Sequence, residues 1–277
     1  MLVGIYANPD RDIGLGFTRK LIRRLSERNV GFVVHDSVSD KLDGVRFFGS
    51  DCDPRPDVIL SLGGDGTILS AINFAAPAGI PVMGVNLGGM GFLTAVTADE
   101  NAIDDVVKML VDGAYSVGER SMLSVTVGGK TYIALNEMVF YKGSLGKTVN
   151  MEVRVGGSHV AQYKADGFIV STPTGSTAWA LSAGGPIICP DVPCLLLIPM
   201  NCHQLSARPV IAGDVDPVTV LGGGPGSIIA DGNVIAENAE GMMVRLSECK
   251  AKLVTHHGFD FYGRLTRKLG LAKWEGR

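Results

Sequence analysis

The chain has 277 residues, of which 46% are hydrophobic, and 25 Lys and Arg against 28 Asp and Glu give a formal net charge of −3. A chain of this length can bury a core of its own and forms one large or two modest domains. The near balance of charge gives no broad basic face, so neither nucleic acid nor an anionic membrane is an expected partner.

Features that would place the chain in or across a membrane are not expected. The first residues do not read as a charged leader followed by an apolar stretch, and the most apolar run, residues 194–200, is too short to span a bilayer. The five cysteines are odd in number and irregularly spaced, without the paired Cys-x-x-Cys typical of zinc sites. We therefore expect reduced thiols and a cytoplasmic protein.

The first hundred residues alternate short apolar runs with helical patterns. Strands are expected at residues 2–7, 31–35, 58–62 and 81–85, and helices at residues 17–28 and 68–76. This alternation is typical of a parallel sheet with helices on its faces. Ligands of such sheets bind at the carboxyl ends of the strands.

After a helix expected at residues 102–110, the runs become strand-like and the turns rich in glycine. Strands are expected at 124–127, 131–135, 149–155, 159–163, 218–221, 227–230, 243–246 and 252–255, with a last helix at 261–269. The first four would form two hairpins. We therefore predict an α/β domain at residues 1–98 with a mainly parallel sheet, and a mainly β domain at residues 99–254. The tail, residues 255–277, is predicted to return its helix to the first domain.

The clearest local motif is a glycine-rich turn between the expected strand 58–62 and the following helix. It reads Gly63, Gly64, Asp65, Gly66, Thr67. Glycines let backbone N–H groups approach a phosphate, a helix N-terminus favours an anion, and Thr67 is placed to cap the helix. Asp65 would repel a phosphate unless it binds a hydroxyl or accepts its proton. The alternative is an ordinary tight turn with Asp as a turn residue.

Longer motifs supply a resemblance. The five-residue turn resembles a signature shared by NAD kinases, diacylglycerol- and sphingosine-type lipid kinases and, in variant form, phosphofructokinases. The segment 166–186, Asp-Gly-Phe-Ile-Val-Ser-Thr-Pro-Thr-Gly-Ser-Thr-Ala-Trp-Ala-Leu-Ser-Ala-Gly-Gly-Pro, is very similar to the long signature of the NAD kinase family. Asn136-Glu137, the glycine-rich segment 84–93 and the Leu-Ser-Ala-Arg-Pro element at 205–209 resemble further family motifs in the same order.

The resemblance covers residues 1 to about 270 and departs from the family pattern at a few positions. Gly89 stands where many relatives have Arg, and Cys202 where Pro is common. Trp179 replaces the usual Tyr and keeps an aromatic face for stacking on a base.

The resemblance implies a kinase that phosphorylates the 2′-hydroxyl of NAD, bound between the two domains. Asp65 would bind the adenosine ribose and accept the hydroxyl proton, a role that contributes roughly 10²–10⁴-fold when a base is well positioned. Asn136 would contact adenine or ribose edges, and Glu137 would accept from ribose hydroxyls. The other residues implied in nucleotide binding are Gly63, Gly64, Gly66, Thr67, Lys147, Lys164, Asp166, Thr177, Ala178, Trp179, Ser182 and Asn233.

Several of these positions also have a purely structural interpretation. The helix expected after Gly175, capped by Ser176 or Thr177, is compatible with a core Trp179. Lys164 fits a turn, and Asn233 fits a plain hairpin turn.

The resemblance also implies the other components of the reaction. The phosphoryl donor would be ATP or polyphosphate, with Mg²⁺ or another divalent cation held by ATP oxygens and water rather than by a dedicated protein site. Relatives are homodimers or homotetramers, so an oligomer is expected. The alternatives are a lipid or sugar kinase that shares the Gly-Gly-Asp-Gly-Thr turn, and a non-catalytic NAD(P)-binding sensor.

Overall fold

A computed structural model describes residues 1–89, 91–143, 146–256 and 260–270. The chain forms two compact units, one of Met1–Glu119 with Ala251–Arg277 and the other of Arg120–Lys250. The expected boundaries lay elsewhere, at 98/99 and 254/255. They differ because helix α3 (Ala102–Asp112) packs on α1 (Gly16–Glu27). In addition, strands β7 (Tyr115–Arg120) and β18 (Ala251–His256) join the sheet of the first unit.

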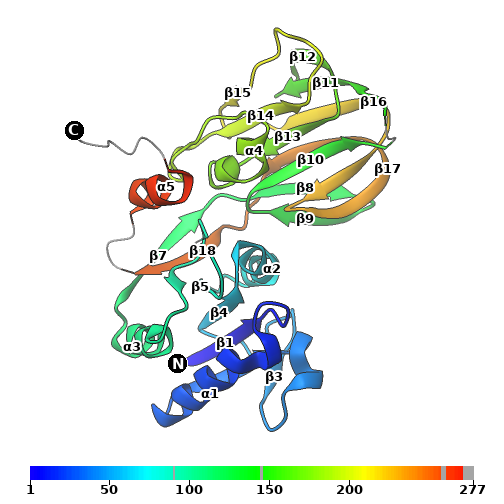
Figure 1. Cartoon of the computed structure of the whole chain (residues 1–277). Helices are drawn as coiled ribbons and strands as arrows, with labels where there is room; N and C mark the ends of the chain where they lie inside the picture. The colour runs from blue at the N-terminus through cyan, green and yellow to red at the C-terminus, as the bar shows by residue number, and fades with distance from the viewer. Residues whose placement is uncertain (90, 144–145, 257–259, 271–277) are drawn as a thin grey trace, which may run out of the picture. The chain divides into compact units, whose positions relative to one another are not determined.

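The first unit is built on a mixed sheet, which has eight strands in the described part of the chain (Figure 1). Seven run in the order β3-β2-β1-β4-β5-β18-β7, and β6 pairs with β5. Their bounds are β1 Leu2–Ala7, β2 Gly31–His35, β3 Phe47–Phe48, β4 Val58–Gly63, β5 Val82–Asn86, β6 Val96–Thr97, β7 Tyr115–Arg120 and β18 Ala251–His256. The strand expected at 252–255 was assigned to the wrong domain, since β18 pairs in parallel with β5.

Both faces of this sheet are buried, as the continuous apolar runs of β1 and β4 require. Alternate residues point to opposite faces, so Val58, Leu60 and Leu62 share a core with Leu21 of α1 and the inner residues of α3. Helix α2 (Asp65–Ala75) packs on β4 and β5. Short 3-10 helices lie at Ile13–Leu15 and Asp36–Lys41.

The second unit is an antiparallel sheet, with ten strands among the described residues. The main path is β15-β14-β13-β10-β16-β17-β8-β9, and β11 pairs with β12 and β16. Their bounds are β8 Leu123–Val127, β9 Lys130–Ala134, β10 Glu137–Lys142, β11 Val149–Val155, β12 Ser158–Ala165, β13 Gly167–Ser171, β14 Leu195–Met200, β15 Val210–Ala212, β16 Val218–Ala230 and β17 Asn233–Leu246. The predicted hairpins β8–β9 and β11–β12 are confirmed.

One expectation for the second half was wrong in detail. The runs expected as separate strands at 218–221 and 227–230 are one strand, β16, whose pairing with β17 shifts register through its glycines. The last helix, α5 (Phe261–Leu269), belongs to the first unit as expected. No helix in the part of the chain that the structure describes is long and apolar enough to cross a membrane.

Candidate functional site

The turn between β4 and α2 is held by the side chain of Thr67. Its Oγ1 accepts hydrogen bonds from the Gly64 N–H at 3.3 Å and from Asn8 Nδ2 at 3.2 Å. A Cβ on Gly63 would overlap this side chain, so only glycine allows the approach. Thr67 therefore helps to cap the helix as expected, but from its third position: α2 begins at Asp65, earlier than predicted, Gly64 is the N-cap residue, and the Thr67 side chain completes a capping box with it.

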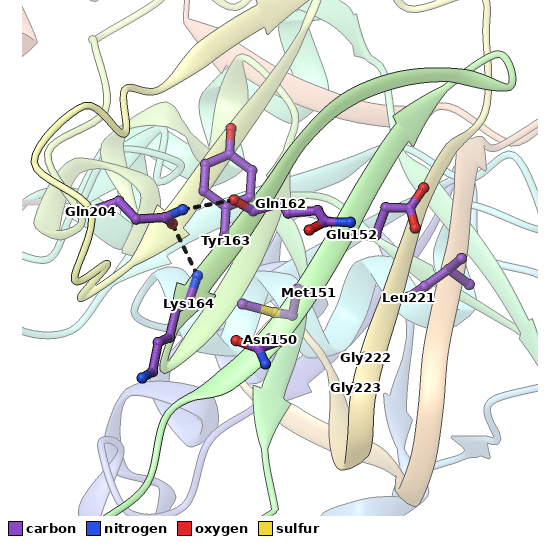
Figure 2. A pocket seen from close by; sticks show the side chains of 10 residues that line it. All are labelled: Asn150, Met151, Glu152, Gln162, Tyr163, Lys164, Gln204, Leu221, Gly222 and Gly223. Atoms are coloured by element: carbon purple, nitrogen blue, oxygen red, sulfur yellow. Dashed lines mark hydrogen bonds between the residues drawn. The ribbon is translucent and has the colours of Figure 1, made fainter.

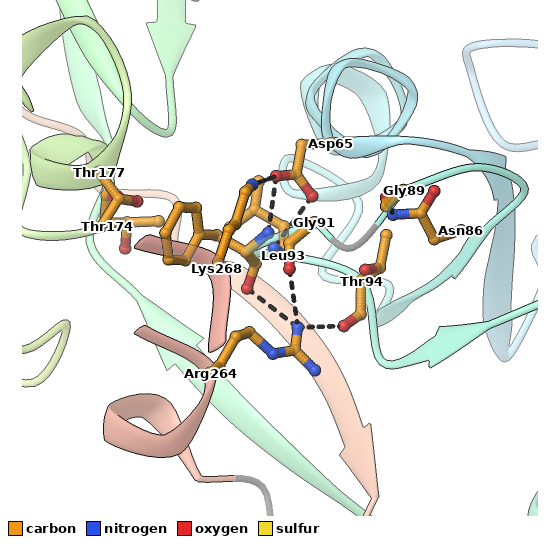
Figure 3. A network of polar contacts seen from close by, with 11 residues as sticks. Asp65, Asn86, Gly89, Gly91, Leu93, Thr94, Thr174, Thr177, Arg264 and Lys268 are labelled. Carbon is orange, nitrogen blue, oxygen red and sulfur yellow. Dashed lines mark hydrogen bonds and ion pairs between the residues drawn. The ribbon is translucent and has the colours of Figure 1, made fainter. Parts of the chain in front are cut away.

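Asp65 lies at the first position of α2 and is oriented by backbone amides (Figure 3). Its Oδ2 accepts from the Phe92 N–H at 2.7 Å, and its Oδ1 accepts from the Leu93 N–H at 3.0 Å. The loop can come this close only because residue 91 is a glycine, since a Cβ on Gly91 would overlap the Asp65 carboxylate. Lys268 of α5 places Nζ 3.7 Å from Asp65 Oδ2. The carboxylate is thus fixed in direction by its own unit.

Asp65 lies in a pocket of about 220 Å³ within the first unit. The lining combines glycine backbone, one carboxylate and two cationic side chains, and consists of Arg11, Gly63, Gly64, Asp65, Asn86, Gly88, Gly89, Gly91 and Lys268. Exposed N–H groups and cations suit an anion, so the pocket can hold a phosphate beside Asp65. Gly66 is exposed and does not line it. Met90, in the glycine-rich segment, lies outside the described residues.

In the second unit, one carboxylate organises the Asn136-Glu137 pair. Asp231, in the turn between β16 and β17, accepts the N–H groups of Leu135 at 2.7 Å, Asn136 at 2.8 Å and Glu137 at 3.1 Å. The carbonyl of Asn136 accepts from Ser171 Oγ at 3.1 Å. Asp231 and Ser171 therefore both hold the backbone at the beginning of β10, and this fixes the positions from which the Asn136 and Glu137 side chains extend.

Glu137 is buried, with 3% of its surface exposed. Burial, and then the negative charge of Asp231, raise its pKa to about 8, against an opposing hydrogen bond from the Trp179 backbone. Its Oε2 has no hydrogen-bond partner among the described residues. A buried polar oxygen without a partner costs free energy, so Glu137 is suited to receive a ligand hydroxyl.

Asp166 carries an ion pair that the sequence did not indicate. Lys142 Nζ donates to its Oδ1 at 2.5 Å, and Asn201 Nδ2 donates to its Oδ2 at 3.1 Å. The hydrogen bond from Lys142, followed by that from Asn201, holds the pKa of Asp166 below its ordinary value. Asp166 is therefore an ionised acceptor of fixed direction at neutral pH.

Trp179 and Ser182 line one apolar pocket of about 470 Å³, together with Tyr141, Ala183, Met200, Asn201 and Ile229. Trp179 is 41% exposed, which leaves an aromatic face open to a planar ligand.

The single helix expected after Gly175 is instead two short turns, Thr174–Thr177 and Trp179–Ser182, because the backbone of Ala178 is not helical. The hydroxyl of Ser176 does not cap a helix but binds the backbone of Ile188. Thr177 and Ala178 are half-buried at the break.

The remaining predicted residues lie apart from this pocket. Lys164 lines a polar hollow of about 410 Å³ between β11, β12 and β16, beside Gln204, which accepts its N–H at 3.0 Å (Figure 2). Lys147 is exposed just before β11. Asn233 is also exposed, and its Nδ2 donates to the Asp231 carbonyl at 3.3 Å, as in an ordinary turn.

Six residues used at these sites were missed by sequence reasoning: Arg11, Lys142, Asn201, Asp231, Arg264 and Lys268. The last two are four residues apart on an expected helix, so they share one face. That spacing was visible in the sequence, although nothing in it indicated which loop the face would meet.

Comparisons with known proteins agree along the chain. Residues 3–115 match the family model described as the ATP-NAD kinase N-terminal domain, and residues 135–257 match the ATP-NAD kinase C-terminal domain. The NAD kinase of Symbiobacterium thermophilum is 36% identical over 274 residues, covering 95% of this chain and 96% of that one. The NAD kinase of Geobacter metallireducens is 36% identical over 279 residues, covering 95% and 94%.

Solved structures share the fold. An NAD kinase from Archaeoglobus fulgidus in complex with ATP has a TM-score of 0.76 at 25% identity, and the match covers 98% of each chain. Yeast NADH kinase complexed with NADH has a TM-score of 0.85 at 22% identity, covering 100% of this chain and 89% of that one. The predicted resemblance is confirmed: the chain belongs to the NAD kinase family.

Proposed function

We propose that the protein is an NAD kinase that uses ATP and forms NADP. The oxygen of the adenosine 2′-hydroxyl attacks the γ-phosphorus, and its proton passes to the Asp65 carboxylate and then to solvent. The bond between the γ-phosphorus and the bridging oxygen breaks, and its electron pair leaves with ADP. Phosphoryl transfer depends mainly on positioning and on stabilising charge.

The observation that carries this proposal is the setting of Asp65. A carboxylate at the head of a helix, in a glycine-walled pocket with Arg11 and Lys268, combines a hydroxyl acceptor with an anion site. Each oxygen of an ionised carboxylate has two acceptor positions. The two hydrogen bonds from the loop N–H groups therefore leave acceptor positions of the Asp65 carboxylate free for the ribose hydroxyl.

The second unit would bind the dinucleotide. Asn136 and Glu137 would take the adenosine ribose, and their support is the backbone network around Asp231 and the unpartnered oxygen of Glu137. Trp179 would stack on a base, with Thr177, Ala178 and Ser182 beside it. Asp166 would bind the distal part of the dinucleotide, and its support is the orientation that Lys142 imposes.

ATP is the proposed donor, with polyphosphate as the alternative. Support comes from the ATP complex of the Archaeoglobus fulgidus relative. The described residues contain no group of three or more His, Cys, Asp or Glu placed to hold a metal. We therefore propose that Mg²⁺ arrives as part of the substrate, held by phosphate oxygens and water. Lys147 and Lys164 remain candidate phosphate contacts.

Location and assembly complete the proposal. All five cysteines are free thiols, which supports a reducing, cytoplasmic setting. A homodimer or homotetramer is proposed from the family resemblance. Sedimentation analysis at assay concentration tests it, and an active monomer would overturn it.

The function is tested by incubating the protein with NAD, Mg²⁺ and ATP and assaying NADP with an NADP-specific dehydrogenase. We expect NADP from wild type and none from Asp65→Asn, with NAD binding largely retained. Glu100→Gln, at an exposed position of the same unit, is the matched control.

Each other result has a separate meaning. Product with polyphosphate alone would change the donor but keep the reaction. NAD binding without product from any donor would favour a non-catalytic sensor. Phosphorylation of a lipid or sugar instead of NAD would favour the other kinases that share the turn.

A further inference from the structure

Helix α5 presents two basic residues to the loop that holds Asp65. Arg264 and Lys268 are four residues apart and lie on the same face of Phe261–Leu269. Figure 3 shows Arg264 directed to the backbone of the segment from Gly91 to Thr94, and Lys268 directed to the Asp65 carboxylate.

Arg264 fixes the position of α5. It is buried, at 9% exposure, and its Nη1 donates to the carbonyls of Phe92 at 3.2 Å, of Gly91 at 3.4 Å and of Thr94. A guanidinium is a rigid, permanently charged donor. The start of the Lys268 side chain, one turn later, is therefore held at a defined place beside the pocket.

Among the described residues, Lys268 contacts Asp65 and Phe92, and its side chain is partly exposed. Its Nζ lies 3.7 Å from Asp65 Oδ2 and 4.0 Å from the centroid of the Phe92 ring, and its side chain is 30% exposed. It also lines the anion pocket with Gly63, Gly64 and Gly88. An ion pair as exposed as this one contributes little to stability, so the pair is poorly explained as a fold-stabilising contact.

The ammonium can exchange partners without unfolding anything. A lysine has a flexible four-carbon stem and three rotatable donors, and the pocket of about 220 Å³ is adjacent to it. A phosphate that enters the pocket brings more negative charge than one carboxylate. The stronger charge would draw Nζ away from Asp65 and leave that carboxylate oxygen available to the ribose hydroxyl.

We propose that Lys268 is a further catalytic residue, which pairs with Asp65 in the free enzyme and contacts the transferred phosphoryl group of the donor during the reaction. The proposal rests on the proposed function. Lys268 would neutralise charge on the equatorial oxygens of the γ-phosphoryl group and would release Asp65 as the donor binds. A fixed cation of this kind acts mainly on the transition state.

The test compares Lys268→Met, Lys268→Arg and Arg267→Met. Arg267 is exposed on the same helix, so its substitution removes one positive charge at a matched position. We expect Lys268→Met to lose about 10²-fold or more in kcat and to raise KM for ATP about tenfold, with KM for NAD within about twofold. Lys268→Arg should recover much of kcat, and Arg267→Met should match wild type.

Binding of Mg-ATP, measured by calorimetry without NAD, provides a readout that does not depend on turnover. We expect roughly tenfold weaker binding in Lys268→Met than in Arg267→Met. Equal kcat and equal ATP affinity in these two variants would overturn the proposal. If wild type formed no NADP, the proposed function would fail, and the calorimetric comparison would still decide whether Lys268 contacts the donor. Circular dichroism confirms that each variant is folded.

Discussion

Arg264 and Asp65 bind different groups of the same short loop. The guanidinium takes the carbonyls of Gly91, Phe92 and Thr94, while the carboxylate takes the N–H groups of Phe92 and Leu93. Arg264 lies 173 residues from Gly91 and 172 residues from Phe92 in the sequence. Helix α5 thereby sets the direction of the carboxylate through the loop.

Substitution of Arg264 is therefore expected to reduce turnover as well as stability. Arg264→Met leaves buried carbonyls without a donor, which costs roughly 1–3 kcal/mol. It also frees the loop that orients Asp65, so kcat should fall about tenfold or more while KM for NAD changes little. Steady-state kinetics well below the melting temperature measure this effect.

Leu265→Ala is the matched control for that prediction. Leu265 is the buried neighbour of Arg264 on α5, and its truncation costs roughly 2–5 kcal/mol. It should lower the melting temperature and leave kcat nearly unchanged. Equal losses of kcat in both variants would show that Arg264 acts only through stability.

Asp231 is expected to control NAD binding through the backbone. Its carboxylate accepts three N–H groups, and an amide in its place would turn an NH₂ toward at least one of them. Asp231→Asn should therefore displace Asn136 and Glu137, raise KM for NAD about tenfold and cost roughly 1–3 kcal/mol of stability. Asp216→Asn, at the exposed turn before β16, is the control. An unchanged KM in Asp231→Asn would contradict this positioning role.

Lys142 should set the ionisation of Asp166. Because its hydrogen bond is the main reason that the Asp166 pKa is lowered, Lys142→Met should raise that pKa toward its ordinary value of 3.8. Carboxyl NMR titration measures the change, and Lys130→Met, at the exposed first residue of β9, is the control. A carboxyl whose pKa is lowered by folding stabilises the protein at pH values above its unfolded-state pKa. This stability is lost as the pH falls through its folded-state pKa. The variant should therefore lose less stability than wild type below about pH 4. An Asp166 pKa that does not move would refute the assignment.

Much of the fold could be predicted because the apolar runs of the strands and the glycine-rich turns depend only on residues close together in sequence. The apolar runs of β1 and β4 and the Gly63-Gly64 turn each depend on neighbouring residues, and they lie where expected. The placement of β18 was missed because parallel pairing with β5 joins residues far apart in sequence. The break at Ala178 was missed because the Ser176 hydroxyl binds Ile188 instead of capping a helix.

The candidate site divides in the same way. Asp65 and Glu137 were identified through motifs, whereas their orienting partners Arg264 and Asp231 depend on tertiary contacts. A carboxylate that holds three backbone amides looks, in sequence, like any Asp-Gly turn. Periodicity therefore finds elements, and glycine-rich motifs find reactive groups, but neither identifies the residues that aim those groups.

Glu137 should make the stability of the second unit depend on pH. Its folded pKa, about 8, lies above the ordinary value of 4.5 because of burial and the charge of Asp231. A group whose pKa is raised by folding contributes stability that is fully present at pH values below its unfolded-state pKa. This stability is lost as the pH rises through its folded-state pKa. The free energy of unfolding of wild type should therefore fall between about pH 4.5 and pH 8 relative to Glu137→Gln.

The variant should match wild type near pH 4.5 and exceed it by on the order of 4 kcal/mol at pH 8, since one pKa unit corresponds to about 1.4 kcal/mol and the folded and unfolded values differ by about 3.5. Glutamine keeps the shape and hydrogen-bonding capacity of the protonated acid, so packing is preserved. Urea unfolding at a series of pH values measures the difference, and Glu240→Gln, exposed on β17, is the control. Parallel curves for wild type and Glu137→Gln across this range would mean that the Glu137 carboxyl titrates as it does in the unfolded chain.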